Sequence, residues 1–201
     1  MTDAVTRRSS TRQRSTKETE VEVHLDLDGS GVSEISTGIP FFDHMLDQLA
    51  RHGGFDLRVK TVGDLAVDAH HTVEDTGIVL GEAFAEALGD KAGVRRFASI
   101  AVPLDEAATE VIVDLSGRPF LHFEIEPPGA AILGNPPFDA QLLEEFWRAF
   151  VVASRITMHL TMLRGRNTHH VIEATFKGAA RALRDAVRVE GTIVPSTKGA
   201  L

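Results

Sequence analysis

Two copies of one short pattern, His-His-x-x-Glu, carry the residues of this chain that are best suited to chemistry. The pattern occurs at His70–Glu74 and again at His169–Glu173, 99 residues later. Each copy opens a run with helical spacing, and residues four apart share a helix face, so the first histidine lies over the glutamate. The second histidine points about 100° away. Two such patterns facing each other would make a two-metal site.

A single histidine on a helix is more often a packed or solvated residue than a metal ligand. Here, however, four of the nine histidines fall within one repeated pattern, and chance explains the repetition poorly. The chain contains no cysteine, so imidazole and carboxylate groups must hold any metal. That ligand set favours Mn, Fe, Co or Zn over soft-metal chemistry.

The composition indicates a folded globular protein. The 201 residues are 43% hydrophobic and 25% charged, enough for one large or two small domains with a real core. A formal net charge of −8 argues against a nucleic-acid-binding protein. No apolar run approaches the ~20 residues of a membrane span. Residues 1–16 lack the apolar core of a signal peptide, so we expect a flexible polar tail and a cytoplasmic protein.

The residues before the first pattern predict the elements that position it. Residues 18–28 alternate apolar and polar side chains, which predicts a strand, and residues 32–37 resume as a plausible hairpin partner. Pro40 suits the first turn of an amphipathic helix that runs to about residue 51. Residues 55–62 alternate again and lead into the first His-His-x-x-Glu helix, which Gly89 is suited to cap.

The second half restates this order. Four segments alternate as strands: residues 95–103, 108–115, 119–126 and 156–163. A loop rich in proline and glycine is expected at residues 127–137, and an amphipathic helix at residues 138–154. The second His-His-x-x-Glu helix should end near Val187. The order of helix, strand and His-His-x-x-Glu helix therefore occurs twice, which indicates a tandem duplication.

The duplication makes a further prediction about metal ligands. His44 lies 26 residues before His70, and the corresponding place in the second half, 24 residues before His169, is occupied by Glu145. If His44 supplies a ligand in one half, Glu145 is the candidate in the other. The alternative for Glu145 is a solvated helix carboxylate beside Glu144.

Six segments, in chain order, resemble the imidazoleglycerol-phosphate dehydratase family of histidine biosynthesis: FFDHMLDQLARHGGFDL, AHHTVEDTGIVLGEA, PLDEA, DLSGRPF, GRNTHHVIEATFK and PSTKG. The resemblance runs from about Glu18 to Leu201 and is to the stand-alone form, without a fused phosphatase. It implies an α+β fold built from a duplicated sheet-plus-two-helix unit. The two four-stranded sheets would have the helices packed between them, as in domain 2 of ribosomal protein S5.

The resemblance also implies how the chain is divided and assembled. The first repeat would span residues 17–93 and the second residues 94–190, followed by a substrate-binding tail at residues 191–201. Family members assemble as homo-oligomers of 24 subunits, with active sites between subunits. The expected partner is therefore a small phosphate-bearing substrate together with further copies of the same chain, and neither nucleic acid nor membrane.

Each active site of the family holds two Mn²⁺ ions. When the family's ligand positions are transferred to this sequence, the residues that would hold one ion are His44, His71, Glu74 and His169. The other is held by His70, His170, Glu173 and the residue at position 145. The family carries a histidine at that last position, whereas this chain has Glu145. A carboxylate can still bind Mn²⁺, although it adds negative charge, and Glu144 or a water is the alternative ligand.

The substrate implied by the resemblance has an imidazole ring, two adjacent hydroxyls and a phosphate. The hydrogen to be removed is not acidic, because no carbonyl lies next to it. Two Lewis-acidic metals on the ring nitrogens would favour the imidazolate, which expels the hydroxyl to give a diazafulvene-like intermediate. Loss of the neighbouring proton then gives imidazole-acetol phosphate. Glu18 and Glu173 are the candidates for the proton transfers, and His52 for catalysis or substrate binding.

The phosphate group needs cationic partners with several donors, and arginine forks suit it well. The residues that match the family's phosphate-side positions are Arg96, Arg118, Lys177, Ser196, Thr197 and Lys198. Without the resemblance, they are ordinary surface cations and a frayed terminus. Glu18 is a further candidate for substrate contact. Asp105 and Glu106 are expected to serve structure or assembly.

Two other classes of protein remain possible from the sequence. A two-metal phosphohydrolase would also bind a phosphate ester, but it would release inorganic phosphate, and aspartates usually dominate such sites. A non-catalytic metal-binding protein would explain the histidines but not the phosphate-binding candidates. A four-helix carboxylate bundle is a weaker alternative, because the strand signals are too many.

Overall fold

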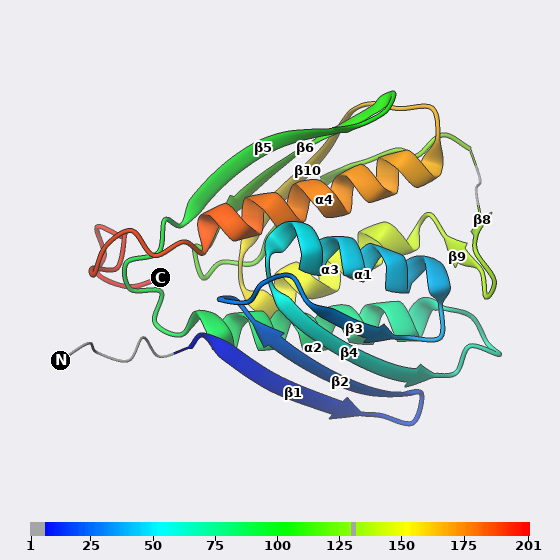
Figure 1. Cartoon of the computed structure of the whole chain (residues 1–201), viewed down its shortest axis with the longest axis horizontal. Helices are drawn as coiled ribbons and strands as arrows, with labels where there is room; N and C mark the ends of the chain where they lie inside the picture. Colours follow the sequence, from blue (N-terminus) through cyan, green and yellow to red (C-terminus); the bar gives the residue numbers. More distant parts are fainter. Residues whose placement is uncertain (1–6, 130–131) are drawn as a thin grey trace.

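Two four-stranded sheets enclose four helices in the computed structural model, which describes residues 7–129 and 132–201 (Figure 1). The first sheet has the order β1 (Ser9–Ser15), β2 (Thr19–Asp26), β4 (Asp56–Gly63), β3 (Ser33–Ser36). The second has the order β5 (Phe97–Leu104), β6 (Ala107–Asp114), β10 (Thr157–Arg164), β7 (Phe120–Glu124). The helices are α1 (Pro40–Gly53), α2 (His70–Leu88), α3 (Leu142–Ser154) and α4 (Thr168–Ala186).

The predicted duplication is confirmed by the strand pairing. In both sheets the first two strands form an antiparallel hairpin, and the second strand also pairs antiparallel with the last. The third strand pairs parallel with the last in both sheets. The first helix of each half ends on a left-handed residue, Gly54 (φ 69°) or Arg155 (φ 56°). Gly89 caps α2, as its position predicted.

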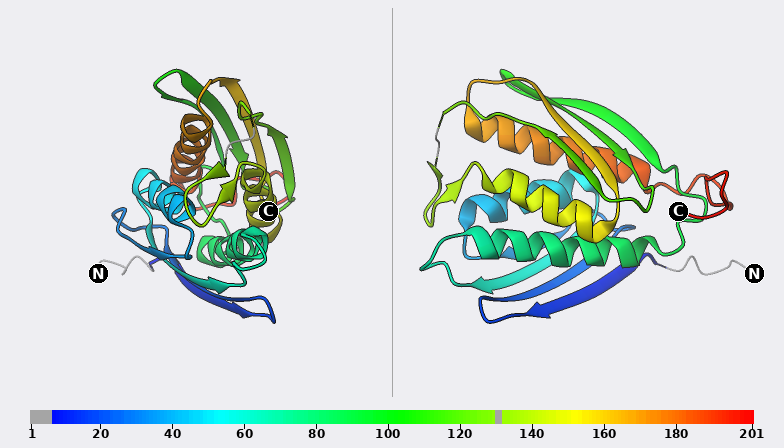
Figure 2. Two further views of the ribbon diagram at one scale, coloured as in Figure 1. Left: turned by 90° about the vertical axis from the view of Figure 1, so that its right-hand side faces the viewer. Right: turned by 180° about the vertical axis from the view of Figure 1, so that it is seen from behind.

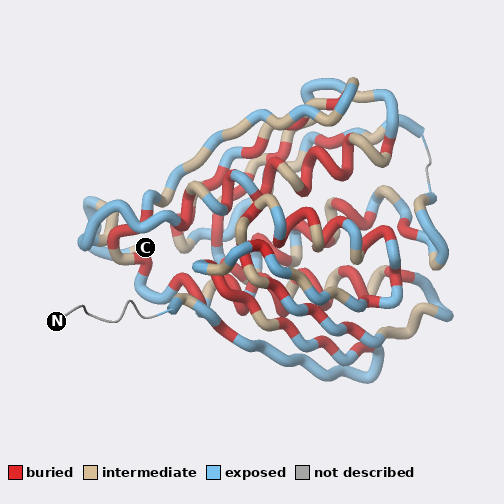
Figure 3. The backbone as a smooth tube through the Cα atoms, viewed as in Figure 1, coloured by how far each residue is buried: buried red, intermediate tan, exposed pale blue. Residues whose placement is uncertain are grey.

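Each sheet buries one face against two helices, so that the core lies between the sheets (Figures 2 and 3). Helices α1 and α2 cover the first sheet, and α3 and α4 cover the second. Across the middle, α1 faces α4 and α2 faces α3. Apolar side chains alternate inward along the central strands, among them Val21 and Val23 of β2 and Val111 and Val113 of β6.

Residues 32–37 are not the hairpin partner of β2 that the sequence predicted. They form β3, which pairs parallel with β4. The reason is that α1 lies between β3 and β4 in the chain, and a helical crossover returns the chain in the parallel sense. The expected helix at residues 138–154 begins only at Leu142. The residues before it, Phe138–Asp139, form strand β9, which pairs with strand β8 (Ile132–Leu133) in the predicted loop.

The expectation of a flexible tail over residues 1–16 is wrong for Ser9–Ser15, which form the edge strand β1; residues 1–6 lie outside the described part. The sequence of β1 contains no apolar residue, so hydrophobic alternation could not reveal it. Ionic contacts replace apolar ones: Arg14 Nε lies 3.1 Å from Asp75 Oδ1, and Arg12 Nε 2.9 Å from Glu86 Oε2, both on α2. The first repeat therefore starts at β1.

Within the described ranges, we found no helix that combines the length and the apolar character needed to cross a membrane.

Candidate metal centre

Both His-His pairs lie in the first turn of a helix, where neighbouring side chains fix the backbone. The Asn167 side chain accepts hydrogen bonds from the N–H groups of His169 (2.9 Å) and His170 (3.4 Å) at the start of α4. Asp68 accepts one from the N–H of His70 (2.7 Å) at the start of α2. Such capping satisfies donors that a helix N-terminus leaves free. The motif residues are therefore held at two equivalent helix ends.

Three candidate ligands come together where α1 meets α4. His44 Nε2 lies 3.4 Å from Glu173 Oε2, and His169 Nε2 lies 2.9 Å from the same oxygen. One ligand atom from each residue falls within a radius typical of a metal site, with all three within 4.8 Å of one another. The other Glu173 oxygen lies 2.7 Å from Lys177 Nζ. Burial raises the pKa of Glu173, but hydrogen bonds from Lys177 and His169 outweigh it and hold the pKa below its usual value.

The equivalent meeting of α2 with α3 holds the other candidates. His70 Nε2 lies 3.8 Å from Glu74 Oε2. On α3, Glu144 is engaged by Arg148, whereas Glu145 is half-buried and has no hydrogen-bond or ion-pair partner in the part of the chain that the structure describes. Of the two neighbouring carboxylates, Glu145 is thus the one that is available to bind a metal ion.

The second histidine of each pair is held by a carboxylate on its Nδ1 side. His71 Nδ1 donates to Asp64 (3.0 Å), and His170 Nδ1 donates to Glu106 (2.8 Å). These hydrogen bonds raise the pKa of both histidines. The bond from His170, with a backbone N–H bond from Arg166, lowers the pKa of Glu106 to about 2. Each ring is thereby oriented with Nε2 as the free ligand atom, as is usual for metal-binding histidines.

Sequence reasoning missed Asp64 and gave Glu106 only a role in structure or assembly. Glu106 lies 64 residues before His170 and reaches it only through the β5–β6 hairpin, so no local spacing signals the contact. The carboxylate Glu18 lies in the equivalent β1–β2 turn, with Oε2 3.9 Å from His71 Nε2. It is mostly exposed and lies on the His71 side, away from the His44–His169–Glu173 cluster.

His52 is part of a polar row on α1. Its Nε2 lies 3.2 Å from Gln48 Oε1, and Gln48 Nε2 lies 3.5 Å from His44 Nδ1. Burial lowers the pKa of His52, and the nearby cations Lys177 and Arg181 lower it further. His52 therefore lies next to the cluster of His44, His169 and Glu173, close to Lys177.

All the phosphate-side candidates except Lys177 line a separate cavity of about 700 Å³. Its lining includes Arg96, Arg118 and the tail residues 196–198. The Arg96 guanidinium forks onto Asp114 (2.7 and 3.2 Å) and also donates to the Pro195 carbonyl (2.7 Å), which ties the tail to the sheet. Arg118 is largely exposed, with Nη2 3.9 Å from Asp114. Lys177 is absent from this lining and stays with Glu173.

The cavity and the histidine motifs lie at opposite ends of one chain. The backbone N–H of Arg96 donates to the carbonyl of Ala186, the last residue of α4, whereas His169 is in the first turn of that helix. At 1.5 Å per residue, this separates them by about 25 Å. In Figure 1, α2 and α4 begin at the right, and the C-terminal tail lies at the left. One small substrate molecule therefore cannot touch both ends of the same chain.

The ligand sets implied by the family are also divided. Within the described residues, His44, His169 and Glu173 form the only group of three histidine or carboxylate side chains whose ligand atoms all lie within 4.8 Å of one another. This cluster joins Glu173 to His44 and His169, whereas the resemblance places Glu173 on the other ion, with His70, His170 and Glu145.

The fold and site together define a duplicated α+β protein with a candidate histidine–carboxylate metal centre. The family model described as imidazoleglycerol-phosphate dehydratase matches residues 37–183. The chain therefore belongs to the imidazoleglycerol-phosphate dehydratase family, and it is a dehydratase of histidine biosynthesis.

Relatives and solved structures agree with this assignment. The dehydratase of Acidothermus cellulolyticus is 57% identical over 96% of this chain and 93% of its own length. That of Gluconacetobacter diazotrophicus is 53% identical over 98% and 99%. The crystal structure of the Staphylococcus aureus dehydratase matches with a TM-score of 0.80 at 38% identity, over 90% of this chain and 99% of that one. The Pyrococcus furiosus structure gives 0.81 at 36%, over 94% and 100%.

Proposed function

We propose that this protein converts D-erythro-imidazoleglycerol phosphate to imidazole-acetol phosphate, in the cytoplasm, with two Mn²⁺ ions in each active site. The observation that carries the proposal is the pair of His-His-x-x-Glu motifs on equivalent helix ends, with both second histidines oriented by carboxylates. Family membership supports the reaction class, and the positions of the motifs support the choice of candidate ligands.

The residues present fit a hard-to-borderline divalent cation. Carboxylates and neutral imidazoles are suitable ligands for Mn²⁺, Glu173 is favoured in its ionised form, and Asp64 and Glu106 leave Nε2 of their histidines free. We assign one ion to His44 and His169 of one copy with His71 and Glu74 of another. We assign the other ion to His70 and Glu145 of one copy with His170 and Glu173 of another. When bound, the ions supply Lewis acidity toward the nitrogens of the substrate ring.

Glu18 is the stronger candidate for the proton acceptor. Both Glu173 oxygens have a partner within the chain, Lys177 on one and His169 on the other, and Glu173 is also assigned as a metal ligand. Glu18, by contrast, is mostly exposed at the edge of the His71 half of the site, and its one ion-pair contact among the described residues is the long 3.9 Å approach to His71 Nε2. Its turn is fixed because Thr16 Oγ1 accepts the backbone N–H of Glu18 (3.1 Å). His52, beside Glu173, is placed to contact the substrate or to pass a proton.

The phosphate is held by a different copy from the one that supplies the neighbouring histidines. Arg96, Arg118 and the tail residues Ser196, Thr197 and Lys198 line one cavity, about 25 Å from the motifs of their own chain. A neighbouring copy must bring its cavity to those motifs, with Lys177 as the cation nearest the metal ligands. The requirement for several copies agrees with a closed assembly of 24 subunits.

The proposal is tested with metal-stripped protein and imidazoleglycerol phosphate, with and without Mn²⁺, by following ketone product and free phosphate. Ketone that forms only with metal supports the dehydratase. Free phosphate without ketone would instead indicate a two-metal phosphohydrolase. His70→Ala and His169→Ala should both lose activity and bind less metal, and full activity in both would refute the two-metal site.

Glu145 is tested separately, because the family carries histidine at its position. Glu145→His should preserve Mn²⁺ content and activity, since imidazole can take the same place in the ligand set. Glu145→Ala should lower both. If neither substitution changes the metal content, Glu145 is not a ligand.

A further inference from the structure

The β1–β2 turn, which carries Glu18, is anchored to α2 by a buried carboxylate. This carboxylate is Asp75, which is 7% exposed and directly follows the candidate ligand Glu74. One of its oxygens accepts a hydrogen bond from the hydroxyl of Thr19, itself 3% exposed, and the other lies 3.1 Å from Arg14 Nε. These two partners stand on the strands at either side of the turn. Both ends of the turn are therefore held to the helix that bears the first motif.

Hydrogen bonds within the turn fix its shape without using the carboxylate of Glu18. Thr16 Oγ1 accepts the backbone N–H groups of Glu18 (3.1 Å) and Thr19 (3.0 Å), and the N–H of Thr16 donates to the carbonyl of Thr19 (2.9 Å). The Glu18 side chain is left mostly exposed, 3.9 Å from His71 Nε2. Because the turn is closed on itself, its contacts with Asp75 determine where the Glu18 carboxylate lies relative to α2.

The second half of the chain lacks this anchor. Its equivalent turn joins β5 to β6, and both turns lie at the end of the molecule where α2 and α4 begin (Figure 1). The register of the sheets makes Ala107 the counterpart of Thr19, and the position after the His-His-x-x-Glu motif makes Ala174 the counterpart of Asp75. Neither alanine has a polar side-chain atom, so another group must hold the second turn.

That group is Glu106, the counterpart of Glu18. Its carboxylate accepts two backbone N–H groups just before α4 (2.8 and 3.1 Å) and the Nδ1–H of His170 (2.8 Å). In the first half, Asp64 makes the corresponding bond to His71 Nδ1. One half thus uses its turn glutamate as a fastener, whereas the other uses different carboxylates for that purpose and leaves its turn glutamate facing the site.

We propose that Asp75 is a positioning residue, which acts through Thr19 and fixes the turn so that Glu18 meets the substrate on the His71 side of the site. The inference rests on the proposed function for the part that Glu18 takes in it. A proton acceptor works only within hydrogen-bond reach of the proton that it removes, and a displacement of about 1 Å can cost about 100-fold in rate. A loosened turn should therefore slow the dehydration and leave the binding of metal and phosphate unchanged.

Thr19→Val and Thr19→Ser separate the hydroxyl from the shape of the side chain. Valine has nearly the shape of threonine without the hydroxyl, and serine keeps the hydroxyl. In the Mn²⁺-loaded protein, Thr19→Val should lower kcat about 10- to 100-fold, while KM for imidazoleglycerol phosphate and the Mn²⁺ content stay at their wild-type values. Thr19→Ser should keep most of the wild-type kcat. An unchanged kcat in Thr19→Val would overturn the proposal.

Two further variants distinguish positioning from a general loss of packing. Thr61 is also buried and also joins the first sheet to α2, through a 2.8 Å hydrogen bond with Thr76 Oγ1, but it pairs with Val21 inside the sheet. Thr61→Val should keep the wild-type kcat, and a loss as large as in Thr19→Val would contradict the proposal. If Thr19→Val fails to fold, Thr19→Ala combined with Asp75→Ala removes both partners of the buried contact and should show the same loss of kcat.

A double-mutant cycle tests whether Thr19 acts through Glu18. Glu18→Gln alone removes the proton acceptor and should lower kcat. Adding Thr19→Val to this variant should cause no further loss, because the turn then has no carboxylate to position. Losses that multiply in the double variant would show that Thr19 acts independently of Glu18 and would refute the positioning role.

The absence of cysteine allows a measurement that does not depend on activity. A spin label on Lys17→Cys reports the motion of the turn, in which Lys17 is exposed. The label should become more mobile when Thr19→Val is added and should not change when Thr61→Val is added. Unchanged mobility with Thr19→Val would overturn this inference. Failure of the wild type to form ketone would instead overturn the proposed function, so the two failures are distinguished.

Discussion

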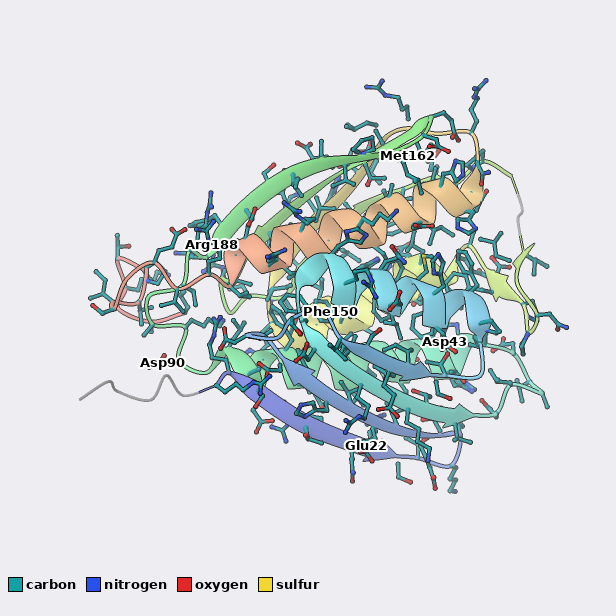
Figure 4. All side chains as sticks on the ribbon, in the orientation of Figure 1. Glu22, Asp43, Asp90, Phe150, Met162 and Arg188 are labelled. Carbon is teal, nitrogen blue, oxygen red and sulfur yellow. The ribbon has the colours of Figure 1, made fainter. Side chains whose placement is uncertain are left out.

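The two helix pairs between the sheets, α2 with α3 and α1 with α4, have equivalent places in the fold but differ in the side chains at their contacts. Helix α2 packs closely against α3 through Gly77 and Gly81. A Cβ at these positions would stand 2.8 Å from the carbonyl oxygen of Phe146 and 2.6 Å from that of Phe150. Figure 4 places Phe150 between the sheets. This contact is a close approach of two backbones, and along most of its length it leaves no room for functional side chains.

The pair formed by α1 and α4 is polar instead. His44, Gln48 and His52 follow one face of α1 toward Glu173 and Lys177 of α4. The equivalent positions of α3 are Glu145, Ala149 and Ala153. Duplication therefore left both motif helices with candidate ligands in their first turn. Only one helix pair carries a row of polar side chains leading away from the candidate ligands, and the other contributes packing.

The largest expected effect comes from disrupting the close packing of α2 against α3. Gly81→Ala should lower the free energy of unfolding by about 2 kcal/mol, because the new methyl group meets backbone that cannot move away cheaply. An ordinary helical glycine would instead gain about 1 kcal/mol from the same change. Gly191→Ala, which meets nothing within 4 Å, is the control. Denaturant unfolding measures both, and an unchanged or increased stability for Gly81→Ala would contradict the close packing.

The carboxylates that orient the second histidines should have similar effects in the two halves. Asp64→Asn and Glu106→Gln should each weaken Mn²⁺ binding about 10- to 100-fold, because each histidine loses the partner that fixes its ring. Competition with a chelator measures this without any assay of activity. Glu22→Gln, on the outer face of the first sheet, should bind as wild type. Unchanged affinity in both variants would show that the carboxylates do not position metal ligands.

Gln48→Ala gives helix α1 the residue that α3 carries at the equivalent position, Ala149. The variant loses the side chain between His44 and His52, and we expect Mn²⁺ to bind up to about tenfold more weakly. Gln48 is buried, so the free energy of unfolding should fall by about 1 kcal/mol, the typical net contribution of one hydrogen bond. A metal titration alongside an unfolding curve separates the two effects. A large loss of stability with normal metal binding would make Gln48 a packing residue.

The smallest effect concerns acid stability. The pKa of Glu106 lies at about 2 in the folded chain against an ordinary 4.5, so its contribution is present above pH 4.5 and is lost as the pH falls toward 2. The difference in unfolding midpoint between the wild type and Glu106→Gln should therefore shrink across that interval. A difference that stays constant from pH 6 to pH 2 would show that the ionised carboxylate contributes no stability.

Local patterns predicted much of this molecule, and contacts between distant segments account for the rest. Helical spacing located both His-His-x-x-Glu helices, and their repetition revealed the duplication. Strand β1 was missed because ionic contacts with α2, and not alternating apolar residues, hold it to the fold. Asp64 and Glu106 acquire their roles only when turns bring them to His71 and His170. The separation of the phosphate-side candidates from the histidine motifs follows from the direction of α4, which no residue type encodes.

The central claim is that one active site takes its metal ligands and its phosphate-binding groups from different copies. His169→Ala and Arg118→Ala damage opposite ends of the chain, and each variant alone should be inactive. Unfolding the two together and refolding them as a 1:1 mixture should restore ketone formation to about a quarter of the wild-type level, because random assembly leaves that share of sites with both ends intact. Activity no higher than that of the separate variants would contradict the shared site.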